Sequence, residues 1–201
     1  NYYGVGIDEA SYNHIDRNIV SNNAGGIWLG SGGNSVSNNT ISSNLAYGVQ
    51  LDGGSSNRVD RNYIGNNGYG IELLSADDNN ITGNIMTSNE YGISLASSSG
   101  NSIYHNNFIC NTIHVQNMAS NNTWDDSYPS GGNYWDDYDK VDADGDGIGD
   151  APYMIDANNQ DRYPLVVPLG PIPIVWDGMI YPIEINSNST ISRFHFNASQ
   201  K

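Results

Sequence analysis

This sequence has little cysteine, few basic residues and no long apolar run, and each shortage excludes a class of structure or partner. Its one cysteine, Cys110, cannot form an intrachain disulfide or a cysteine-based zinc site. Seven Lys and Arg residues against 22 Asp and Glu give a net charge of −15, which makes nucleic acids and anionic membranes poor partners. The apolar runs, of which residues 165–169 are an example, are far shorter than the roughly 18 to 20 residues of a membrane span. We therefore expect no nucleic-acid partner and no membrane span.

Asparagine is abundant instead, at 30 of the 201 positions, and it recurs with a nearly constant period. A Gly-[Ile/Val]-x-[Ile/Leu] motif begins every 22 residues, at Gly4, Gly26, Gly48, Gly70 and Gly92. A second apolar column, Ile15, Val36, Val59, Ile81 and Ile103, has an Asn three positions after each member, and another Asn column is Asn22, Asn44, Asn67, Asn89 and Asn111. This pattern predicts a solenoid, in which equivalent short strands stack about 4.8 Å apart as parallel sheets around apolar columns. The bend asparagines are expected to adopt left-handed backbone and to bond amide to amide between coils.

The Tyr-Gly-Ile-x-Leu repeat, with its Ser- and Asn-rich turns, resembles the right-handed parallel β-helix repeats of the NosD-like, carbohydrate-binding and sugar-hydrolase superfamily. The resemblance covers residues 1–118. It implies an all-β fold, a right-handed parallel β-helix of about 22-residue coils. Similar repeats occur in polysaccharide-active enzymes and in non-catalytic surface proteins, so the resemblance implies the fold more firmly than the chemistry.

The next region of the chain is acidic and aromatic. Eleven of the 22 acidic residues fall within residues 125–161. Inside it, residues 142–150 place carboxylates at loop positions 1, 3, 5 and 9 and a glycine at position 6, which is calcium-loop spacing. We expect Ca²⁺ to be bound by the side chains of Asp142, Asp144, Asp146 and Asp150 and by the carbonyl of Ile148. An EF-hand is not expected, because Tyr153 stands where that motif needs a bidentate Glu.

This loop resembles the structural calcium loops of dockerin and thrombospondin type 3 repeats. Its flanks are Gly132-Asn133-Tyr134-Trp135-Asp136-Asp137-Tyr138 and Ala151-Pro152-Tyr153-Met154-Ile155. They resemble the segment that closes β-helices in archaeal cell-surface NosD-like proteins, which implies a calcium-stabilised cap over residues 119–165. An open solenoid end exposes apolar core and unpaired strand edges, and this is the physical reason to expect a cap.

The tail is expected to be separate. Residues 166–178 are rich in Pro and Gly and predict a linker, and residues 179–201 predict strands at 181–185 and 190–196. A lone hairpin is marginally stable in water, so these strands either pack on the β-helix, begin a truncated following domain or pair with a neighbouring subunit. The last alternative predicts a homo-oligomer or filament. Because the chain begins at Asn1 without Met or a signal peptide, we also expect it to be a segment of a longer precursor.

One outward column of the predicted coils offers a platform for a glycan. Trp28 could stack on a sugar ring while Gln50 and Glu72, one and two coils further on, bond its hydroxyls. A second column carries Asp16-Arg17 and Asp60-Arg61, whose alternating charges also fit simple pairing between coils. The carboxylate pair with clustered Lys and Arg expected of a lyase or glycosidase is missing from these columns, so we predict no catalytic residue.

These features favour a secreted or cell-surface structural protein whose β-helix contacts a polysaccharide or cell-wall glycan, or assembles with other subunits. Millimolar extracellular calcium suits the predicted loop. Two alternatives stay open. A polysaccharide-active enzyme would need two carboxylates, or a carboxylate and a base, within catalytic distance. A periplasmic copper-binding NosD-like module would need converging His and Met side chains, for which His114 and Met118 are the nearest pair in sequence.

Overall fold

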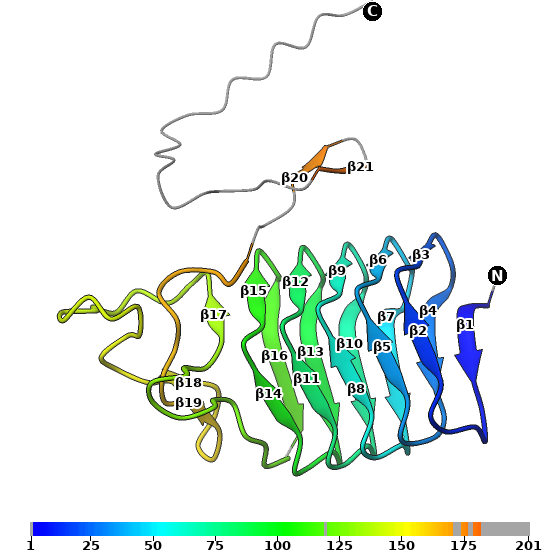
Figure 1. The fold of residues 1–201 in the computed structure, drawn as a ribbon, viewed down its shortest axis with the longest axis horizontal. Helices are drawn as coiled ribbons and strands as arrows, with labels where there is room; N and C mark the ends of the chain where they lie inside the picture. Colours follow the sequence, from blue (N-terminus) through cyan, green and yellow to red (C-terminus); the bar gives the residue numbers. More distant parts are fainter. Residues whose placement is uncertain (1, 119, 171–173, 177–178, 182–201) are drawn as a thin grey trace, which may run out of the picture. The chain divides into compact units, whose positions relative to one another are not determined.

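The computed structural model describes residues 2–118, 120–170, 174–176 and 179–181, and these form an all-β structure without a helix (Figure 1). Three parallel sheets make up the solenoid. Sheet A contains β1 (Tyr3–Ile7), β4 (Gly25–Leu29), β7 (Tyr47–Asp52), β10 (Tyr69–Leu74), β13 (Tyr91–Ala96) and β16 (Ile113–Met118). Sheet B contains β2 (His14–Asp16), β5 (Ser35–Ser37), β8 (Arg58–Asp60), β11 (Asn80–Thr82) and β14 (Ser102–Tyr104). Sheet C contains β3 (Ile19–Ser21), β6 (Thr40–Ser42), β9 (Tyr63–Gly65), β12 (Ile85–Thr87), β15 (Asn107–Ile109) and β17 (Tyr134–Trp135). The predicted fold class is confirmed.

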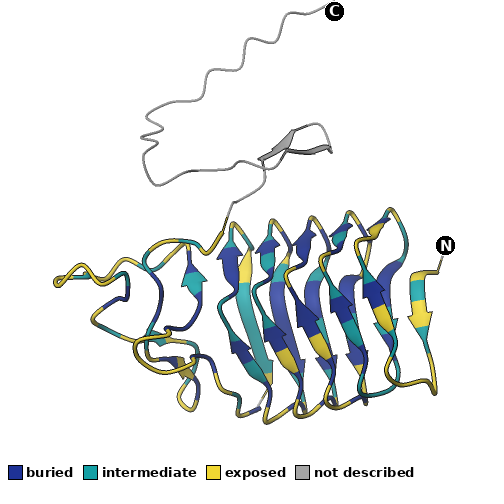
Figure 2. Ribbon diagram, viewed as in Figure 1, coloured by how far each residue is buried: buried dark blue, intermediate teal, exposed yellow. Residues whose placement is uncertain are grey.

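The strands stack in register, so that the repeat positions of the sequence become inward columns. In β10 and β13, Ile71 pairs with Ile93 and Leu73 pairs with Leu95, each 22 residues apart. All four side chains are fully buried. Branched aliphatic residues suit a pleated surface that is buried on one side, which is why the short strands form at these positions. Figure 2 shows the buried residues on the strands that enclose the interior and the exposed residues mostly in the connecting turns.

Asparagine ladders line three corners of the coils. At each step an Asn donates its backbone N–H, and at most steps its Nδ2–H, to the Oδ1 of the equivalent Asn one coil further on. Asn39 donates to Asn62 in this way at 2.9 and 3.0 Å, and its Nδ2 also donates to the carbonyl of Ile15 at 2.8 Å. The ladders are Asn13, Asn34, Asn57, Asn79, Asn101 and Asn122; Asn18, Asn39, Asn62, Asn84 and Asn106; and Asn23, Asn44, Asn67, Asn89 and Asn111. Buried amides therefore find partners without a sheet at the corner.

The structure corrects the sequence analysis on two points about these corners. The third ladder contains Asn23, whereas the sequence analysis assigned Asn22. Left-handed backbone occurs at the residue before the ladder Asn, as in Asn22 (φ 60°) and Arg61 (φ 53°), and not at the ladder Asn. The two tasks are separate because the left-handed residue turns the chain, and the next residue can then aim its amide along the stack.

Residues 120–169 form the cap, which continues the stacking with irregular chain. β17 pairs in parallel with β15 and extends sheet C. β18 (Tyr153–Met154) and β19 (Gln160–Asp161) form a small antiparallel sheet. The side chain of Asn107 both accepts a hydrogen bond from the backbone of Leu169 and donates one to it, at 2.9 and 2.8 Å. The cap is therefore tied to the last complete coil at its far end as well as at its start.

Two of the ladders run on into the cap. Asn133 accepts the backbone N–H of Asn106 at 3.0 Å, and Asn159 accepts that of Asn122 at 3.0 Å. Each extended ladder then ends on an aspartate. Asp161 accepts the backbone N–H of Asn133 at 2.6 Å, and Asp156 accepts that of Asn159 at 3.0 Å.

An aromatic column covers the last coil. The ring of Trp135 lies between those of Phe108 and Tyr153, with centroid distances of 4.3 and 4.2 Å and interplanar angles of 10° and 5°. Trp124 packs beside Trp135, and both indoles are 1% exposed. Aromatic rings of this size contribute the large apolar area that an otherwise polar segment needs in order to fold.

Residues 170–201 form a second unit. β20 (Ile174–Trp176) pairs antiparallel with β21 (Met179–Tyr181). The first of these strands lies within residues 166–178, for which the sequence predicts a linker. The predicted strands at 181–185 and 190–196 lie, apart from Tyr181, outside the described residues.

Candidate functional site

Two buried aspartates hold the cap together. Asp161 is fully buried, and its Oδ2 accepts the backbone N–H of Asn133 and, at 3.0 Å, the Nε1–H of Trp135, while its Oδ1 accepts the backbone N–H of Tyr163 at 3.1 Å. Burial raises the pKa of Asp161 to about 6, although all three hydrogen bonds favour the ionised form. Its protonation is therefore tied to the integrity of the cap.

The second of them, Asp125, is 4% exposed and faces Arg162, with N···O distances of 2.6 and 2.9 Å. Burial opposes its ionisation, but the hydrogen bonds from Arg162 hold the pKa of Asp125 below its ordinary value. Arg162 therefore compensates the burial of this carboxylate, and its removal would leave a buried charge without its basic partner.

The loop at residues 142–150 brings three of the predicted calcium ligands together. Carboxylate oxygens within 4.8 Å of one another come from Asp142, Asp144 and Asp146. The backbone N–H groups of Gly145 and Gly147 donate to Asp142 at 2.9 and 3.0 Å, so the chain wraps around this carboxylate. Both glycines have left-handed backbone (φ 75° and 90°), which is the sharp turn that the sequence pattern predicts.

The two remaining predicted ligands are not among these three carboxylates, although the backbone N–H of Ile148 donates to Asp146 at 2.8 Å. Asp150 Oδ2 accepts the backbone N–H of Ala143 at 3.0 Å, and Asp150 does not belong to the group of three. Ile148 is 8% exposed and forms an antiparallel bridge with Leu165, whose hydrogen bonds are made by flanking residues. Its own carbonyl accepts no hydrogen bond within the described part of the chain, so it is free to face a cation.

The outward face of sheet A carries the predicted glycan residues in one column. Register places Trp28 beside Gln50 and Gln50 beside Glu72. Gln50 Nε2 donates to Glu72 Oε2 at 2.6 Å, and the ring of Trp28 lies almost parallel to that of Tyr3, with centroids 5.6 Å apart. Next to them is a hollow of about 230 Å³ lined in part by Tyr3, Tyr47 and Gln50. Burial raises the pKa of Tyr47, so its hydroxyl is a neutral donor at physiological pH.

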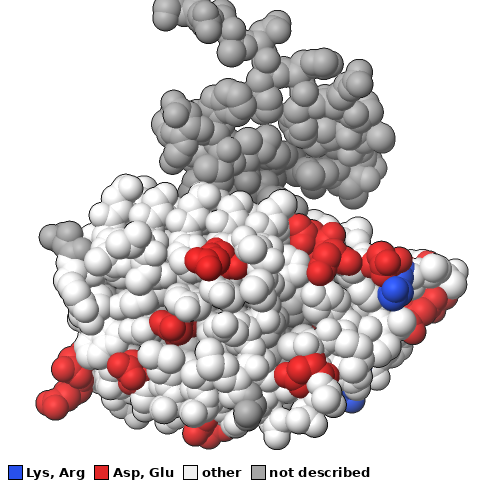
Figure 3. All heavy atoms as spheres, turned by 180° about the vertical axis from the view of Figure 1, so that it is seen from behind, with Lys and Arg blue, Asp and Glu red and all other residues white. Residues whose placement is uncertain are grey.

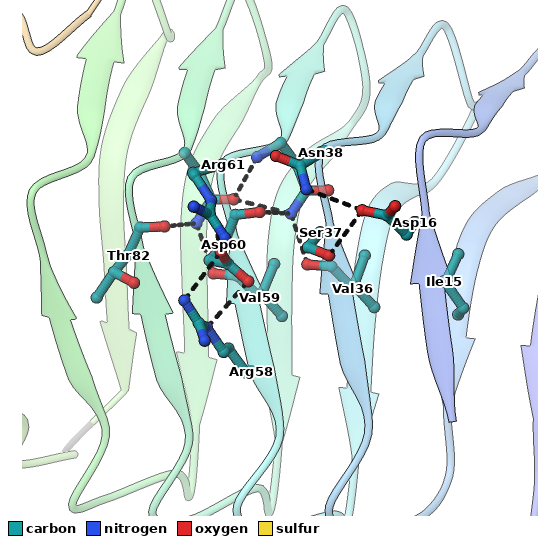
Figure 4. A network of polar contacts seen from close by, with 12 residues as sticks. Ile15, Asp16, Val36, Ser37, Asn38, Arg58, Val59, Asp60, Arg61 and Thr82 are labelled. Atoms are coloured by element: carbon teal, nitrogen blue, oxygen red, sulfur yellow. Dashed lines mark hydrogen bonds and ion pairs between the residues drawn. The ribbon is translucent and has the colours of Figure 1, made fainter. Parts of the chain in front are cut away.

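The outward face of sheet B carries a network of charged groups that satisfy one another (Figure 4). Asp60, which is 2% exposed, pairs with Arg58 at 3.0 Å and with Arg61 at 2.9 Å. Asp16 accepts a hydrogen bond from Asn38 at 2.8 Å, and this bond is the main reason why the pKa of Asp16 is lowered. The network fits pairing between coils.

A further cluster, which the sequence analysis missed, lies where the last coil meets the cap. His114 Nε2 in β16 is 2.8 Å from Asp136 Oδ1 and 3.4 Å from Asp137 Oδ1, and the His114 side chain is 8% exposed. Part of the signal was visible, because His114 stands at the glycine position of the repeat and the two aspartates directly follow Trp135. What the sequence does not reveal is that β17 pairs with β15 and so brings the aspartates over His114. Met118, half exposed on the same strand, is not part of the cluster.

Charge is uneven over the surface. Figure 3 shows acidic side chains in separate patches and few basic ones on the face that it presents. Within residues 2–118 and 120–170, every Lys and Arg is in an ion pair with an Asp: Arg17, Arg58, Arg61, Lys140 and Arg162. The described residues contain no helix that is long and apolar enough to span a membrane.

One family model matches the chain over residues 1–140, and it is described as "Periplasmic copper-binding protein (NosD)". Comparison with curated proteins and with solved structures found no match. The matched span contains the coils of all three sheets and reaches through β17, but it ends before the loop at residues 142–150. Since this is more than half of the chain, the solenoid and the start of its cap are a domain of that family. The protein belongs to the NosD family.

Proposed function

We propose that this chain is an extracytoplasmic solenoid domain that binds a neutral glycan on the outward face of sheet A. The observation that carries the proposal is the column formed by Trp28, Gln50 and Glu72 beside the ring of Tyr3. An aromatic face can support the apolar face of a sugar ring, while an amide and a carboxylate exchange hydrogen bonds with its hydroxyls. The location outside the cytoplasm follows from the family, which is described as periplasmic. Within this location, we propose that the domain lies at the cell surface.

The size of the site favours a polymer over a small ligand. The hollow of about 230 Å³ is smaller than the roughly 300 to 1,000 Å³ of pockets for drug-sized ligands. A flat column with one shallow hollow fits one or two sugar units of a chain that lies along the face. The glycan is expected to be neutral, because the described basic side chains are already paired with aspartates.

Affinity electrophoresis against neutral polysaccharides and polyuronates tests the proposal. The full chain is expected to be retarded by a neutral glycan, and Trp28→Ala is expected to weaken binding at least about tenfold, or 1.4 kcal/mol. Tyr12→Ala is the matched control, because Tyr12 is 83% exposed and is not among the residues of this column or its hollow. Binding that is absent for every glycan, or equal in Trp28→Ala and Tyr12→Ala, would contradict the proposal. Release of unsaturated products from polyuronates would instead favour the enzyme alternative.

We also propose that Ca²⁺ orders the cap through the loop at residues 142–150. Three clustered carboxylates and the available carbonyl of Ile148 are oxygen ligands of the kind that Ca²⁺ prefers, and without a cation the carboxylates repel one another. Asp150 would have to leave the backbone of Ala143, or bind through water, to complete the set.

Thermal unfolding with and without EDTA tests the calcium proposal. Calcium at 100 times its dissociation constant would stabilise the folded chain by about 2.7 kcal/mol. We therefore expect EDTA to lower Tm by several degrees and Asp144→Ala to abolish that response. Asp52→Ala, which removes an exposed aspartate at the end of β7, is expected to keep it. A Tm that does not respond to EDTA rules out the calcium proposal.

Self-assembly through the C-terminal strands remains a second proposed use of the domain. The residues concerned, 182–201, lie outside the described part of the chain, so the proposal rests on the sequence pattern alone. Light scattering of the full chain and of a variant without residues 179–201 tests it. A monomer in both cases would rule it out.

A further inference from the structure

The last coil has a histidine at a position where the inner coils allow only glycine. A Cβ added at Gly92 would lie 2.6 Å from the carbonyl oxygen of His114, because the backbone of the next coil passes directly over this position. His114 itself is in the last strand of sheet A, so no further coil lies over it. Its side chain occupies that space, and the cap supplies Asp136 and Asp137 on the other side.

In each carboxylate of this cluster, one oxygen accepts a hydrogen bond from the protein and the other faces His114. Asp136 Oδ2 accepts the backbone N–H of Cys110 at 2.6 Å, and Asp137 Oδ2 accepts the hydroxyl of Tyr153 at 3.2 Å. Their Oδ1 atoms both face His114 Nε2. Donors that fix the outer oxygen of a carboxylate are the usual support of a metal ligand, because they orient the inner oxygen toward the ion.

From this geometry we propose that His114, Asp136 and Asp137 bind a divalent transition-metal ion of the Zn²⁺ class. One imidazole nitrogen and two carboxylate oxygens form a ligand set that such ions accept. Ligands about 2.1 Å from a tetrahedral ion lie about 3.4 Å apart. The Nε2 to Asp137 distance is already 3.4 Å, and Asp136, at 2.8 Å, needs to move by roughly half an ångström to reach that spacing.

The surroundings leave room for a fourth ligand. A cavity of about 510 Å³ borders the cluster and is lined by Cys110, Tyr153 and Met154 among others. A water molecule could complete the coordination there. The site differs in chemistry from the loop at residues 142–150, which offers only oxygen ligands, so Ca²⁺ and a transition metal would not compete for one position.

The competing explanation is a hydrogen bond from His114 Nε2–H to Asp136 without a metal. It is favoured by the 2.8 Å contact with Asp136 and by Asn111 Nδ2, which lies 3.5 Å from His114 Nδ1 and would donate to it. A metal on Nε2 requires the proton on Nδ1 and so removes this contact. At 3.5 Å the contact is at the limit of a hydrogen bond, so little is lost.

Titration of the full 201-residue chain with Zn²⁺ distinguishes the two. The chain is first treated with EDTA and then kept in millimolar Ca²⁺, so that the cap is ordered throughout. We expect Zn²⁺ to bind at one site by calorimetry, and Co²⁺ to give a visible absorption band there. Asp137→Asn, at a residue that is more than half exposed, is expected to weaken binding by more than tenfold and His114→Gln by more than about 100-fold.

His105→Gln is the control for the histidine, because His105 Nε2 is 2.9 Å from the carbonyl of Ser130 and outside the cluster. Asp52→Asn, at an exposed aspartate of β7 outside both acidic clusters, is the control for the loss of a negative charge. Both are expected to bind Zn²⁺ as the unchanged chain does. Circular dichroism of each variant confirms that the fold is kept. No Zn²⁺ binding, or equal binding by the unchanged chain, Asp137→Asn and His114→Gln, would overturn the proposal and leave the hydrogen bond between His114 and Asp136.

Discussion

The coils and the cap satisfy the same kinds of buried group by different means. In the coils a ladder Asn finds its equivalent 21 to 23 residues away, because the whole coil repeats. In the cap, Asn133 and Asn159 join the same ladders from 27 and 37 residues away, along chain that has no period. Each layer of the stack therefore requires the ladder contact and an inward aromatic or aliphatic side chain, while the path of the chain between them can vary.

The two regions also differ in how they handle charge. The coil interior is aliphatic, and the buried carboxylate of Asp60 sits on the outward face between two arginines. The cap interior contains Asp161, which has only neutral N–H donors around it. Within the coils, each ladder N–H finds its acceptor on the next coil, so no buried charge is needed. At the end of the stack there is no next coil, and an aspartate accepts these N–H groups instead.

The largest effect is expected from the aromatic column of the cap. Trp135→Ala removes the stacking on Phe108 and Tyr153 and leaves Asp161 without one donor, so we expect a loss of about 4 kcal/mol in the free energy of unfolding. Leu73→Ala in a middle coil is expected to cost about 3 kcal/mol. Urea unfolding followed by circular dichroism measures both. A loss below about 1 kcal/mol for Trp135→Ala would mean that the cap does not stabilise the coils.

The next effect is a dependence of the free energy of unfolding on pH, which we expect to come from the cap. The pKa of Asp161 is raised to about 6 from an unfolded value of 3.8, so between these values the folded chain keeps a proton that the unfolded chain releases. Stability from this group is full below about pH 4 and falls by about 3 kcal/mol as the pH rises through 6. Aspartates with lowered pKa, such as Asp16 and Asp125, lose their contribution only as the pH falls below their ordinary range.

Urea unfolding at pH 4.5 and pH 7 measures this slope, and Asp161→Asn is the control. The amide does not titrate, so the variant is expected to show no loss of stability between about pH 4 and 7 from this position. It is less stable than the unchanged chain at low pH, because its Nδ2 faces the N–H of Tyr163. An equal slope in both proteins would assign the effect to another group.

Ladder residues in the two regions are expected to contribute equally. Asn84→Ala leaves the backbone N–H of Asn62 without an acceptor, and Asn159→Ala does the same to the backbone N–H of Asn122 and the indole N–H of Trp124. Each substitution should cost about 2 kcal/mol, since the freed donors are buried. Thermal and urea unfolding of both variants check this. A much smaller loss in the cap would show that water enters there and replaces the amide.

The smallest difference is expected from the ion pairs. Arg162→Ala in the cap leaves Asp125 without a basic partner, whereas Arg61→Ala in the coils leaves Asp60 with Arg58. Both arginines are more than half exposed, so solvent screening limits the losses to about 1 and below 0.5 kcal/mol. Unfolding at low and high salt measures them, and equal losses would contradict the role given to Arg58.

The register of the coils could be predicted from the sequence, whereas only the existence of the cap could be, and not its contacts. Ile71 pairs with Val49, 22 residues earlier, as the fixed period of the sequence predicts. The register can therefore be predicted even though the path of the chain between the two residues is unknown. Asn159 joins a ladder after 37 residues of irregular chain, and no local pattern marks it. The cluster of aspartates at residues 142–150 was recognisable because its members are neighbours in sequence. The cluster at His114 was not, because its members meet only after β17 has paired with β15.

The asparagine ladders give the solenoid a polarity that its parallel strands alone would not. Every ladder step donates from the earlier coil to the later one, so within the described residues each ladder has an amide oxygen at its first Asn and an N–H group at its last. Such aligned bonds polarise one another, as the peptide dipoles of a helix do. Asp161 and Asp156 then act on this rod of dipoles as a counter-charge at its positive terminus. Any partner that extended the stack beyond its first coil would have to bring donors, and one that replaced the cap would have to bring acceptors.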